Sequence, residues 1–274
     1  KAGGIIPAPD KGYTVTSNQG EYVCKFVVVA TGGMSYPKTG STGDGYKLGA
    51  QLGHKIIEPR PALTPVEIAN FPFVHLAGMS FEDLPMTIWR DEKKVKECQG
   101  DLLFTHKGLS GPGILNHTRW IKEKDLLTIN FIKTLSPIEF QKNILNDINT
   151  SGKEMIKTVL RKYDLPKRLL DSLFSYTNID EEIKCGQISK EMRIQLVQAL
   201  TRFPMEVSKL GGFHVAMVTA GGIHMKEINP TTMESRRKAN VYFIGEVLDI
   251  DGDTGGYNIQ AALSSAVLCA SGIM

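Results

Sequence analysis

The sequence contains little cysteine, and its cysteines lie far apart. Only four of the 274 residues are cysteine, and no two of them form a C-x-x-C pair. Widely spaced thiols argue against a disulfide framework, a cysteine-based zinc site and dithiol redox chemistry. The four are Cys24, Cys98, Cys185 and Cys269.

Long apolar runs are missing as well. No stretch has the length and apolarity that a membrane span needs, and no charged start is followed by the apolar core of a signal peptide. We therefore expect a soluble, cytoplasmic protein that does not bind membranes.

Signatures of several common enzyme classes are absent. The sequence has no G-K-[ST] phosphate loop, no G-x-S-x-G elbow and no H-E-x-x-H, so ATP, acyl-transfer and zinc-protease chemistry lose support. The dinucleotide signature G-x-G-x-x-G is missing too, because two glycine pairs have its first spacing but lack the third glycine.

The composition is that of a globular protein. Hydrophobic residues make up 42% of the chain, which is enough to bury a sizeable core and is typical of two domains at this length. The net charge of +3 is mildly basic. It neither requires nor excludes a nucleic-acid partner, and it favours an ordinary solvated surface.

The most informative stretch is the segment 242–260, YFIGEVLDIDGDTGGYNIQ. An apolar run ends at Gly245 and Glu246, an acidic Gly-rich turn follows, and a predicted helix begins near Gly255 and Gly256. Glycine lets a ligand approach the backbone closely, and a helix N-terminus carries partial positive charge. The pattern is typical of a nucleotide-binding sheet that presents backbone N–H groups to its ligand.

A second strand end of this kind lies far upstream. The apolar run 26–30 ends in Thr31, Gly32 and Gly33, and the continuous hydrophobicity of 27–30 predicts a strand covered on both faces. Two such ends predict one site assembled from distant parts of the chain. Because a buried parallel strand needs neighbours and the first Gly-rich turn is absent, we also predict that the chain is a fragment without its N-terminal βαβ unit.

Hydrophobic spacing predicts the remaining elements. Nucleotide-type strands occur on both sides of a region that is first β-rich and then helical, so the predicted fold is α/β (α+β with an insertion). It comprises a partial Rossmann-like domain, residues 1–61 and 219–274, and an inserted domain, residues 62–218. Within the insertion, 62–135 is predicted as β-rich, 136–203 as helical and 204–218 as β; elsewhere we expect a helix at 46–53, a proline-rich extended connector at 59–65, a strand at 213–223 and a buried helix at 257–274.

Four ordered motifs carry a resemblance to a known family. They are ATGGMSYPKTGSTGDG at 30–45, LFTHKGLSGP at 103–112, TAGGI with EINPTTMES between 219 and 235, and GEVLDIDGDTGGYNIQ at 245–260. Together they resemble the bacterial aminoacetone-oxidase-like family of FAD-binding flavoproteins, also described as NAD(FAD)-utilising dehydrogenases. The family's N-terminal βαβ unit, which holds the pyrophosphate and adenosine, has no counterpart in the motifs found here.

The resemblance implies an FAD site. Glu246 would accept hydrogen bonds from ribityl or ribose hydroxyls, and the N–H groups of 256–258 would face the electron-rich edge of the flavin. His106 is an acid/base candidate, or alternatively a residue that organises a turn, and Tyr257 is a second, equally ambiguous catalytic candidate. The implied cofactor-binding residues are Thr31, Gly32, Gly33, Ser35, Tyr36, Gly245, Glu246, Asp249, Gly255, Gly256, Tyr257, Asn258 and Gln260.

An acidic turn offers an alternative to cofactor binding. Asp249, Asp251 and Asp253 alternate as in a cation-binding loop, but no glutamate follows where an EF-hand requires one. We expect a self-solvating Asp-rich turn and no metal site.

The leading functional hypothesis is an FAD-dependent oxidoreductase that exchanges hydride with a small molecule or with NAD(P)H. One alternative keeps the flavin and changes the substrate to a uridine in ribosomal RNA. Another is a structural fragment that does not bind FAD, and for the chain as given we predict no activity. An unpaired sheet edge would further predict homo-oligomers.

Overall fold

The computed structural model describes residues 1–8 and 12–273 and divides into two compact units. Unit 1 comprises Lys1–Thr64 and Gly211–Met274, and unit 2 comprises Pro65–Leu210. The chain thus leaves unit 1 once and returns to it. The mixed α/β class with an inserted β-rich and helical region is confirmed.

Unit 1 begins with a three-stranded antiparallel sheet. It contains β1 (Ala2–Pro7), β2 (Tyr13–Ser17) and β3 (Gly20–Cys24), in that order. A bend at Lys25 separates β3 from the next strand, β4 (Val27–Val29), which belongs to a different sheet.

A pair of parallel strands lies at the centre of unit 1. β4 pairs in parallel with β13 (Val241–Phe243), with Val27 opposite Val241, so both strands end at the same edge. Val27 and Val29 are buried, but Val28 is exposed. The prediction of a strand covered on both faces was therefore wrong for one face of β4.

Two of the three prolines in the predicted connector lie in a strand, and Pro65 lies outside it. β5 (Ile56–Ala62) contains Pro59 and Pro61 and pairs antiparallel with β12 (Val218–Ile223). Proline is tolerated in a strand of a two-stranded sheet because its missing N–H can face away from the partner. The predicted strand 213–223 is correspondingly shorter, since 213–215 form a turn.

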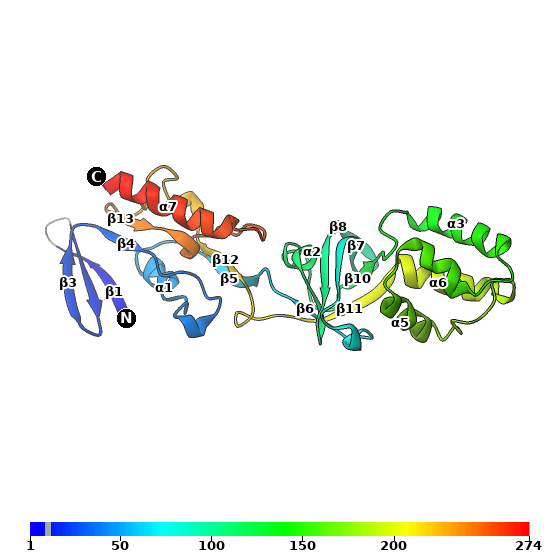
Figure 1. Cartoon of the computed structure of the whole chain (residues 1–274). Coiled ribbons are helices and arrows are strands. Elements are labelled where there is room, and N and C mark those ends of the chain that lie inside the picture. The colour runs from blue at the N-terminus through cyan, green and yellow to red at the C-terminus, as the bar shows by residue number, and fades with distance from the viewer. Residues whose placement is uncertain (9–11, 274) are drawn as a thin grey trace. The chain divides into compact units, whose positions relative to one another are not determined.

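Two helices accompany these strands. α1 (Asp44–Gln51) and α7 (Tyr257–Ile273) lie on opposite sides of β4 and β13 in Figure 1. α1 packs closely against side chains of the neighbouring segments: a Cβ added at Gly45 would clash with the Thr31 side chain, and one at Gly49 with the Ile223 side chain. These glycines set the spacing between α1 and the strand ends.

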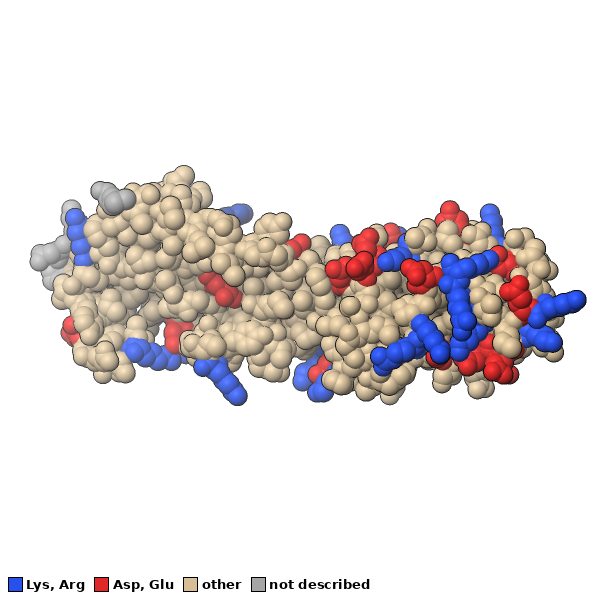
Figure 2. Space-filling model, in the orientation of Figure 1, with Lys and Arg blue, Asp and Glu red and all other residues tan. Residues whose placement is uncertain are grey.

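α7 is largely exposed, so the prediction of a buried helix was wrong. Only Ser265 and Cys269 are buried. Ile259, Leu263 and Val267, at a spacing of four residues, are 70%, 59% and 65% exposed. Figure 2 shows few charged side chains over this helix. Apolar residues make burial of a helix face favourable, but they do not show that another segment packs against it.

Unit 2 is built on a closed antiparallel barrel in the order β10-β11-β6-β9-β8-β7. Inward residues alternate with outward ones, as the buried Leu84, Met86 and Ile88 of β7 show. Asp91 and Glu92, both with positive φ, form the tight β7–β8 hairpin turn. The strands are β6 (Val66–Ile68), β7 (Ser80–Arg90), β8 (Lys93–Phe104), β9 (Gly108–Ser110), β10 (Leu126–Ile129) and β11 (Phe203–Leu210).

Helices complete unit 2, as the helical spacing predicted. Phe140, Ile144 and Ile148 line the buried face of α3. Ser136 caps α3 through the N–H of Glu139, whose side chain bonds back to Ser136 N–H. The helices are α2 (Pro112–Leu115), α3 (Pro137–Thr150), α4 (Ile156–Leu160), α5 (Lys167–Thr177) and α6 (Lys190–Thr201).

Short 3-10 turns connect these elements. They are η1 (Pro37–Thr39), η2 (Val74–Leu76), η3 (Arg161–Tyr163), η4 (Cys185–Gln187), η5 (Met225–Glu227) and η6 (Gly245–Val247). None of the helices within residues 1–8 and 12–273 combines the length and apolarity that a bilayer crossing needs.

Candidate functional site

Side chains from three distant segments of unit 1 meet where β4 and β13 end. The loop after β4 supplies Gly33 and Ser35, β12 supplies Thr219, and η6, directly after β13, supplies Glu246. We call these four residues the strand-end cluster. The prediction of one assembly from both strand ends agrees with this geometry.

Thr219 lies at the centre of the strand-end cluster and is fully buried. Its Oγ1 accepts hydrogen bonds from the N–H groups of Met34 (2.8 Å) and Ser35 (3.1 Å). The Ser35 hydroxyl lies 3.2 Å from the same oxygen. The loop after β4 is therefore held by a side chain that is about 185 residues away in the sequence.

Glu246 is a half-buried carboxyl group held by Thr219. The Thr219 N–H donates to Glu246 Oε1 at 2.6 Å. Burial raises the pKa of Glu246, and the hydrogen bonds from Thr219 partly offset that increase. The oxygens of this carboxyl group can accept hydrogen bonds from ligand hydroxyls.

Gly33 leaves just enough room for this arrangement. A Cβ at position 33 would lie 2.5 Å from Thr219 Oγ1 and 2.9 Å from Glu246 Oε1. No side chain larger than hydrogen fits without moving the cluster. Close approach within the protein therefore suffices to explain glycine at this position.

The Gly-rich turn before α7 is organised by Asn258. Its Oδ1 accepts from the Gly252 N–H (2.8 Å), and its Nδ2 donates to the Gly252 carbonyl (3.0 Å). Gly255 and Gly256 have φ of 105° and 93°, a backbone conformation that favours glycine. The first N–H groups of α7 lack intrahelical partners and carry partial positive charge. The Asn258 side chain therefore shapes the turn, and ligand contact would come from the backbone.

Other predicted cofactor residues have partners within the protein. Gly245 N–H donates to Ser265 Oγ (2.9 Å), and Asp249 N–H donates to the Ile223 carbonyl (3.0 Å). Gln260 Nε2 donates to Ser264 Oγ (3.1 Å). Tyr36 lies in the loop after β4 with φ of 51°, and its ring is partly exposed. Thr31 packs against α1, and Gly32 has φ of 71°.

The two catalytic candidates are not part of the strand-end cluster. His106 lies in unit 2, exposed in the turn between β8 and β9. Thr105 organises that turn, because its Oγ1 accepts from Lys107 N–H (3.3 Å) and Gly108 N–H (3.1 Å). Tyr257 is the first residue of α7 and is 67% exposed. Their catalytic roles stay predictions.

Sequence reasoning did not select Thr219 as a site residue. It was noticed only as part of the TAGGI motif, and its two sets of partners lie in other segments. A hydroxyl residue near the start of the fully buried strand β12 was the available signal, because a buried polar group requires partners.

Tyr46 was also missed: its hydroxyl reaches the Glu246 carbonyl (3.5 Å), and burial raises its pKa strongly.

A buried His–Glu–Ser arrangement elsewhere in unit 1 resembles a hydrolase triad but is structural. His54 lies 3.1 Å from Glu227 Oε2 through Nδ1 and 2.8 Å from Ser235 Oγ through Nε2. Ser235 Oγ already accepts from the N–H groups of Arg237 and Lys238. Its hydrogen therefore points to His54, which we assign as the Nδ1–H tautomer. The His54 side chain has no exposed surface, so it cannot reach a substrate.

This network predicts a pH-dependent stability. Hydrogen bonding to Arg237, together with Lys55 N–H and His54, lowers the pKa of Glu227 to about 2, and burial lowers the pKa of His54. Both groups therefore take up protons more readily in the unfolded chain. The contribution of Glu227 is fully present above about pH 4.5 and is lost as the pH falls towards 2, and that of neutral His54 weakens below about pH 6.5.

Glu227→Gln is expected to destabilise unit 1 by about 1–3 kcal/mol at pH 7. Below about pH 4.5 the unfolded chain takes up a proton at Glu227 while the folded chain still holds the carboxylate, so its stabilising contribution declines. The difference in unfolding free energy from the unmodified chain should therefore shrink as the pH falls towards 2. Urea unfolding at several pH values measures it. Glu97→Gln, which removes an exposed carboxylate, is the control. A difference that does not depend on pH would contradict the assignment.

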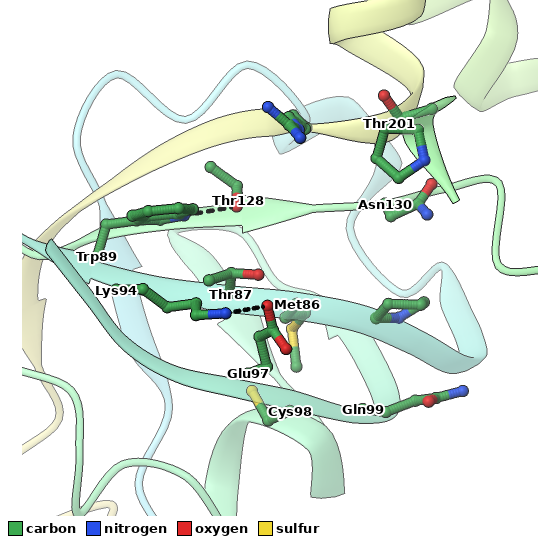
Figure 3. Close-up of a pocket in the computed structure, with 13 residues that line it drawn as sticks. Met86, Thr87, Trp89, Lys94, Glu97, Cys98, Gln99, Thr128, Asn130 and Thr201 are labelled. Atoms are coloured by element: carbon green, nitrogen blue, oxygen red, sulfur yellow. Dashed lines mark hydrogen bonds and ion pairs between the residues drawn. The ribbon is translucent and has the colours of Figure 1, made fainter. Parts of the chain in front are cut away.

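A groove of about 830 Å³ in unit 2 is a competing location for a site. Figure 3 shows it on the outer face of β7, β8 and β10. Two pairs of its polar side chains bond to each other: Trp89 Nε1 donates to Thr128 Oγ1 (2.9 Å), and Lys94 pairs with Glu97 (2.7 Å). Burial raises the pKa of Cys98 to about 11, so this thiol stays protonated. The groove offers no activated nucleophile.

Nothing in the described ranges, 1–8 and 12–273, places three or more His, Cys, Asp or Glu side chains together to hold a metal ion. The Asp-rich turn 249–253 forms no such group either.

Comparison with known proteins identifies the family. The model of the HI0933-like protein Rossmann domain matches residues 4–272, nearly the whole chain. The chain belongs to this family. The finer aminoacetone-oxidase name stays a prediction.

Three curated relatives have names that denote activities. The chain is 35% identical over 268 residues to the ribosomal RNA dihydrouridine synthase of Haemophilus influenzae and 31% identical over 269 residues to that of Escherichia coli. It is 25% identical over 264 residues to the 3-dehydro-bile acid delta(4,6)-reductase of Clostridium scindens. These matches cover 95%, 98% and 94% of the chain but only 63%, 66% and 64% of the relatives. The chain thus spans just under two thirds of their length.

Proposed function

We propose that this chain is part of an FAD-dependent oxidoreductase that saturates a carbon–carbon double bond, with uridine in ribosomal RNA as its substrate. The main supporting observation is the strand-end cluster, in which a half-buried carboxyl group meets Thr219 and the glycine-bearing loop after β4, in a chain of a Rossmann-type family. A Rossmann sheet binds its ligand at the carboxyl ends of its strands.

The residues present fit a flavin cofactor. Glu246 offers carboxylate oxygens for ribityl or ribose hydroxyls, and Gly33 keeps the neighbouring backbone free of a side chain. The N-terminus of α7, preceded by Gly255 and Gly256, offers partial positive charge to the electron-rich edge of the ring. When bound, the flavin would supply the hydride.

The remaining work of the site falls to the chain's own groups. Thr219 holds Glu246 and the loop 33–36 in place, and Asn258 fixes the turn that aims the first N–H groups of α7. Preorganised donors and acceptors of this kind stabilise charge without reorganising during the reaction. NAD(P)H as the electron donor, and His106 as the proton donor, stay parts of the proposal.

The relatives' names support this reaction class. Two of them denote formation of dihydrouridine, which is uridine with a saturated ring bond, and the third denotes reduction of steroid double bonds. Reduction of a double bond is common to all three. The higher identities, 35% and 31%, are to proteins named for RNA, and we therefore favour uridine over a small molecule.

Dihydrouridine formation tests the proposal. The chain is incubated with FAD, NADPH and unmodified ribosomal RNA transcripts, and the digested RNA is analysed by mass spectrometry. We expect nucleosides about 2 Da heavier than uridine, because reduction adds two hydrogens. A chain that binds FAD and oxidises NADPH but leaves every uridine intact would favour a small-molecule substrate. A chain that binds no FAD would favour the non-catalytic alternative.

Self-association through the exposed sheet edge stays a prediction.

A further inference from the structure

A single buried hydroxyl connects the two strand ends of unit 1. Thr219 Oγ1 accepts from two backbone N–H groups of the loop after β4, and Thr219 N–H holds Glu246 Oε1. A hydroxyl oxygen has two acceptor lone pairs and one hydrogen. With both lone pairs used by the loop, its hydrogen is left for the Glu246 carboxylate or for Ser35 Oγ.

The Thr219 end of this connection is shielded from solvent. Thr219 is 0% exposed and Ser35 is buried, so water does not replace a lost bond. Gly33 packs against both Thr219 and Glu246, so closely that there is no room for a methyl group between them. Movement of any one of these residues therefore displaces the others.

We propose that Thr219 is a positioning residue that makes Glu246 and the loop 33–36 respond as one unit to a hydroxyl-bearing ligand. The proposal rests on the proposed function, in which that ligand is the ribityl or ribose portion of FAD. A ligand hydroxyl that donates to Glu246 Oε2 shifts the carboxyl group and with it Oε1. Because Oε1 is bonded to Thr219 N–H, Thr219 transmits this shift to the N–H groups of Met34 and Ser35. Glu246 itself does not contact those N–H groups through any bond recorded in the described residues.

Two other titratable groups lie near Glu246. Tyr46 of α1 donates to the Glu246 carbonyl, and Asp249 follows η6 and adds negative charge near Tyr46. Neither is bonded to Thr219 in the described part of the chain. The transmission therefore depends on the Thr219 hydroxyl and N–H.

Amide hydrogen exchange tests the proposal without requiring flavin. Glu246→Gln is expected to speed exchange of the Met34 and Ser35 amides by about tenfold, because the Thr219 bonds that protect them are weakened. Glu234→Gln is the matched control, since Glu234 is a partly buried carboxylate of unit 1 that accepts from Asn240 N–H (2.7 Å) instead. Unchanged exchange at Met34 and Ser35 in Glu246→Gln would overturn the proposal.

Two substitutions of Thr219 separate positioning from simple packing. Thr219→Val keeps the shape and the N–H but removes the hydroxyl, and we expect about tenfold faster exchange at Met34 and Ser35. Thr219→Ser keeps the hydroxyl and should restore exchange to within about twofold. Equal behaviour of the two variants would contradict the proposal. If Thr219→Val does not fold, Glu246→Gln still decides the question.

Titration with FAD then distinguishes this proposal from the proposed function. If both hold, Thr219→Val weakens FAD binding by about tenfold and Thr219→Ser does not. Exchange effects as expected, together with no FAD binding by the unmodified chain, would preserve the positioning role and reject the flavin site. FAD binding that is equal in all variants would reject the positioning role and retain the flavin site.

Discussion

Gly33→Ala is expected to weaken FAD binding by more than about tenfold and to destabilise unit 1 by about 1–3 kcal/mol. The added methyl group would lie 2.5 Å from Thr219 Oγ1, 2.8 Å from Thr219 Cβ and 2.9 Å from Glu246 Oε1. The two Thr219 atoms belong to a short, fully buried side chain, and Glu246 Oε1 is held by the Thr219 N–H. The strand-end cluster must therefore open to admit the methyl group. Flavin fluorescence quenching and urea unfolding measure the two effects.

Gly152→Ala is the control for this substitution. Gly152 does not require a positive φ, and a Cβ there would meet no atom within 4 Å. Alanine at 152 should leave FAD binding unchanged and alter stability by no more than about 0.5 kcal/mol. If Gly33→Ala behaves like Gly152→Ala, the close approach at Gly33 does not shape a binding site.

Phe104→Ala is expected to destabilise unit 2 by about 3–5 kcal/mol. Phe104 is fully buried at the end of β8 and stacks on Phe73 with ring centroids 5.0 Å apart. It also meets Phe71, Phe81 and Phe131 edge-on. Its removal leaves a cavity among rings that cannot all shift inward. Urea unfolding followed by near-ultraviolet circular dichroism measures the loss.

Ile138→Ala provides the comparison for Phe104→Ala. Ile138 lies on α3 and is mostly exposed, so its truncation should cost no more than about 0.5 kcal/mol. A loss below about 1 kcal/mol for Phe104→Ala would show that the aromatic cluster does not stabilise the barrel.

The meeting of the two strand ends could be predicted from the sequence. The runs before Gly33 and before Gly245 both read as buried strands that stop at glycine, and parallel strands end at the same edge of a sheet. The local sequence pattern is sufficient to predict this meeting, because each strand end is marked by an apolar run that stops at glycine. The helical part of unit 2 was predictable for the same reason, since the spacing of Phe140, Ile144 and Ile148 is a local property.

Features that depend on distant partners could not be predicted. Thr219 bonds to Met34 and Ser35 across about 185 residues, and nothing near Thr219 in the sequence identifies those partners. Closure of the barrel depends on pairings such as Val66 with Leu109, which are likewise long-range. The prediction that α7 is buried failed for a related reason, because an apolar face does not identify the segment that packs against it.

Mapping FAD onto the chain by nuclear magnetic resonance tests the central claim most directly. An isotope-labelled chain is titrated with FAD, and changes in backbone amide shifts are followed. We expect the largest changes to cluster at 31–36, at Thr219, at 245–249 and at 255–260, even if binding is weak. Largest changes at the groove of β7, β8 and β10, or no saturable change at any of these positions, would contradict it.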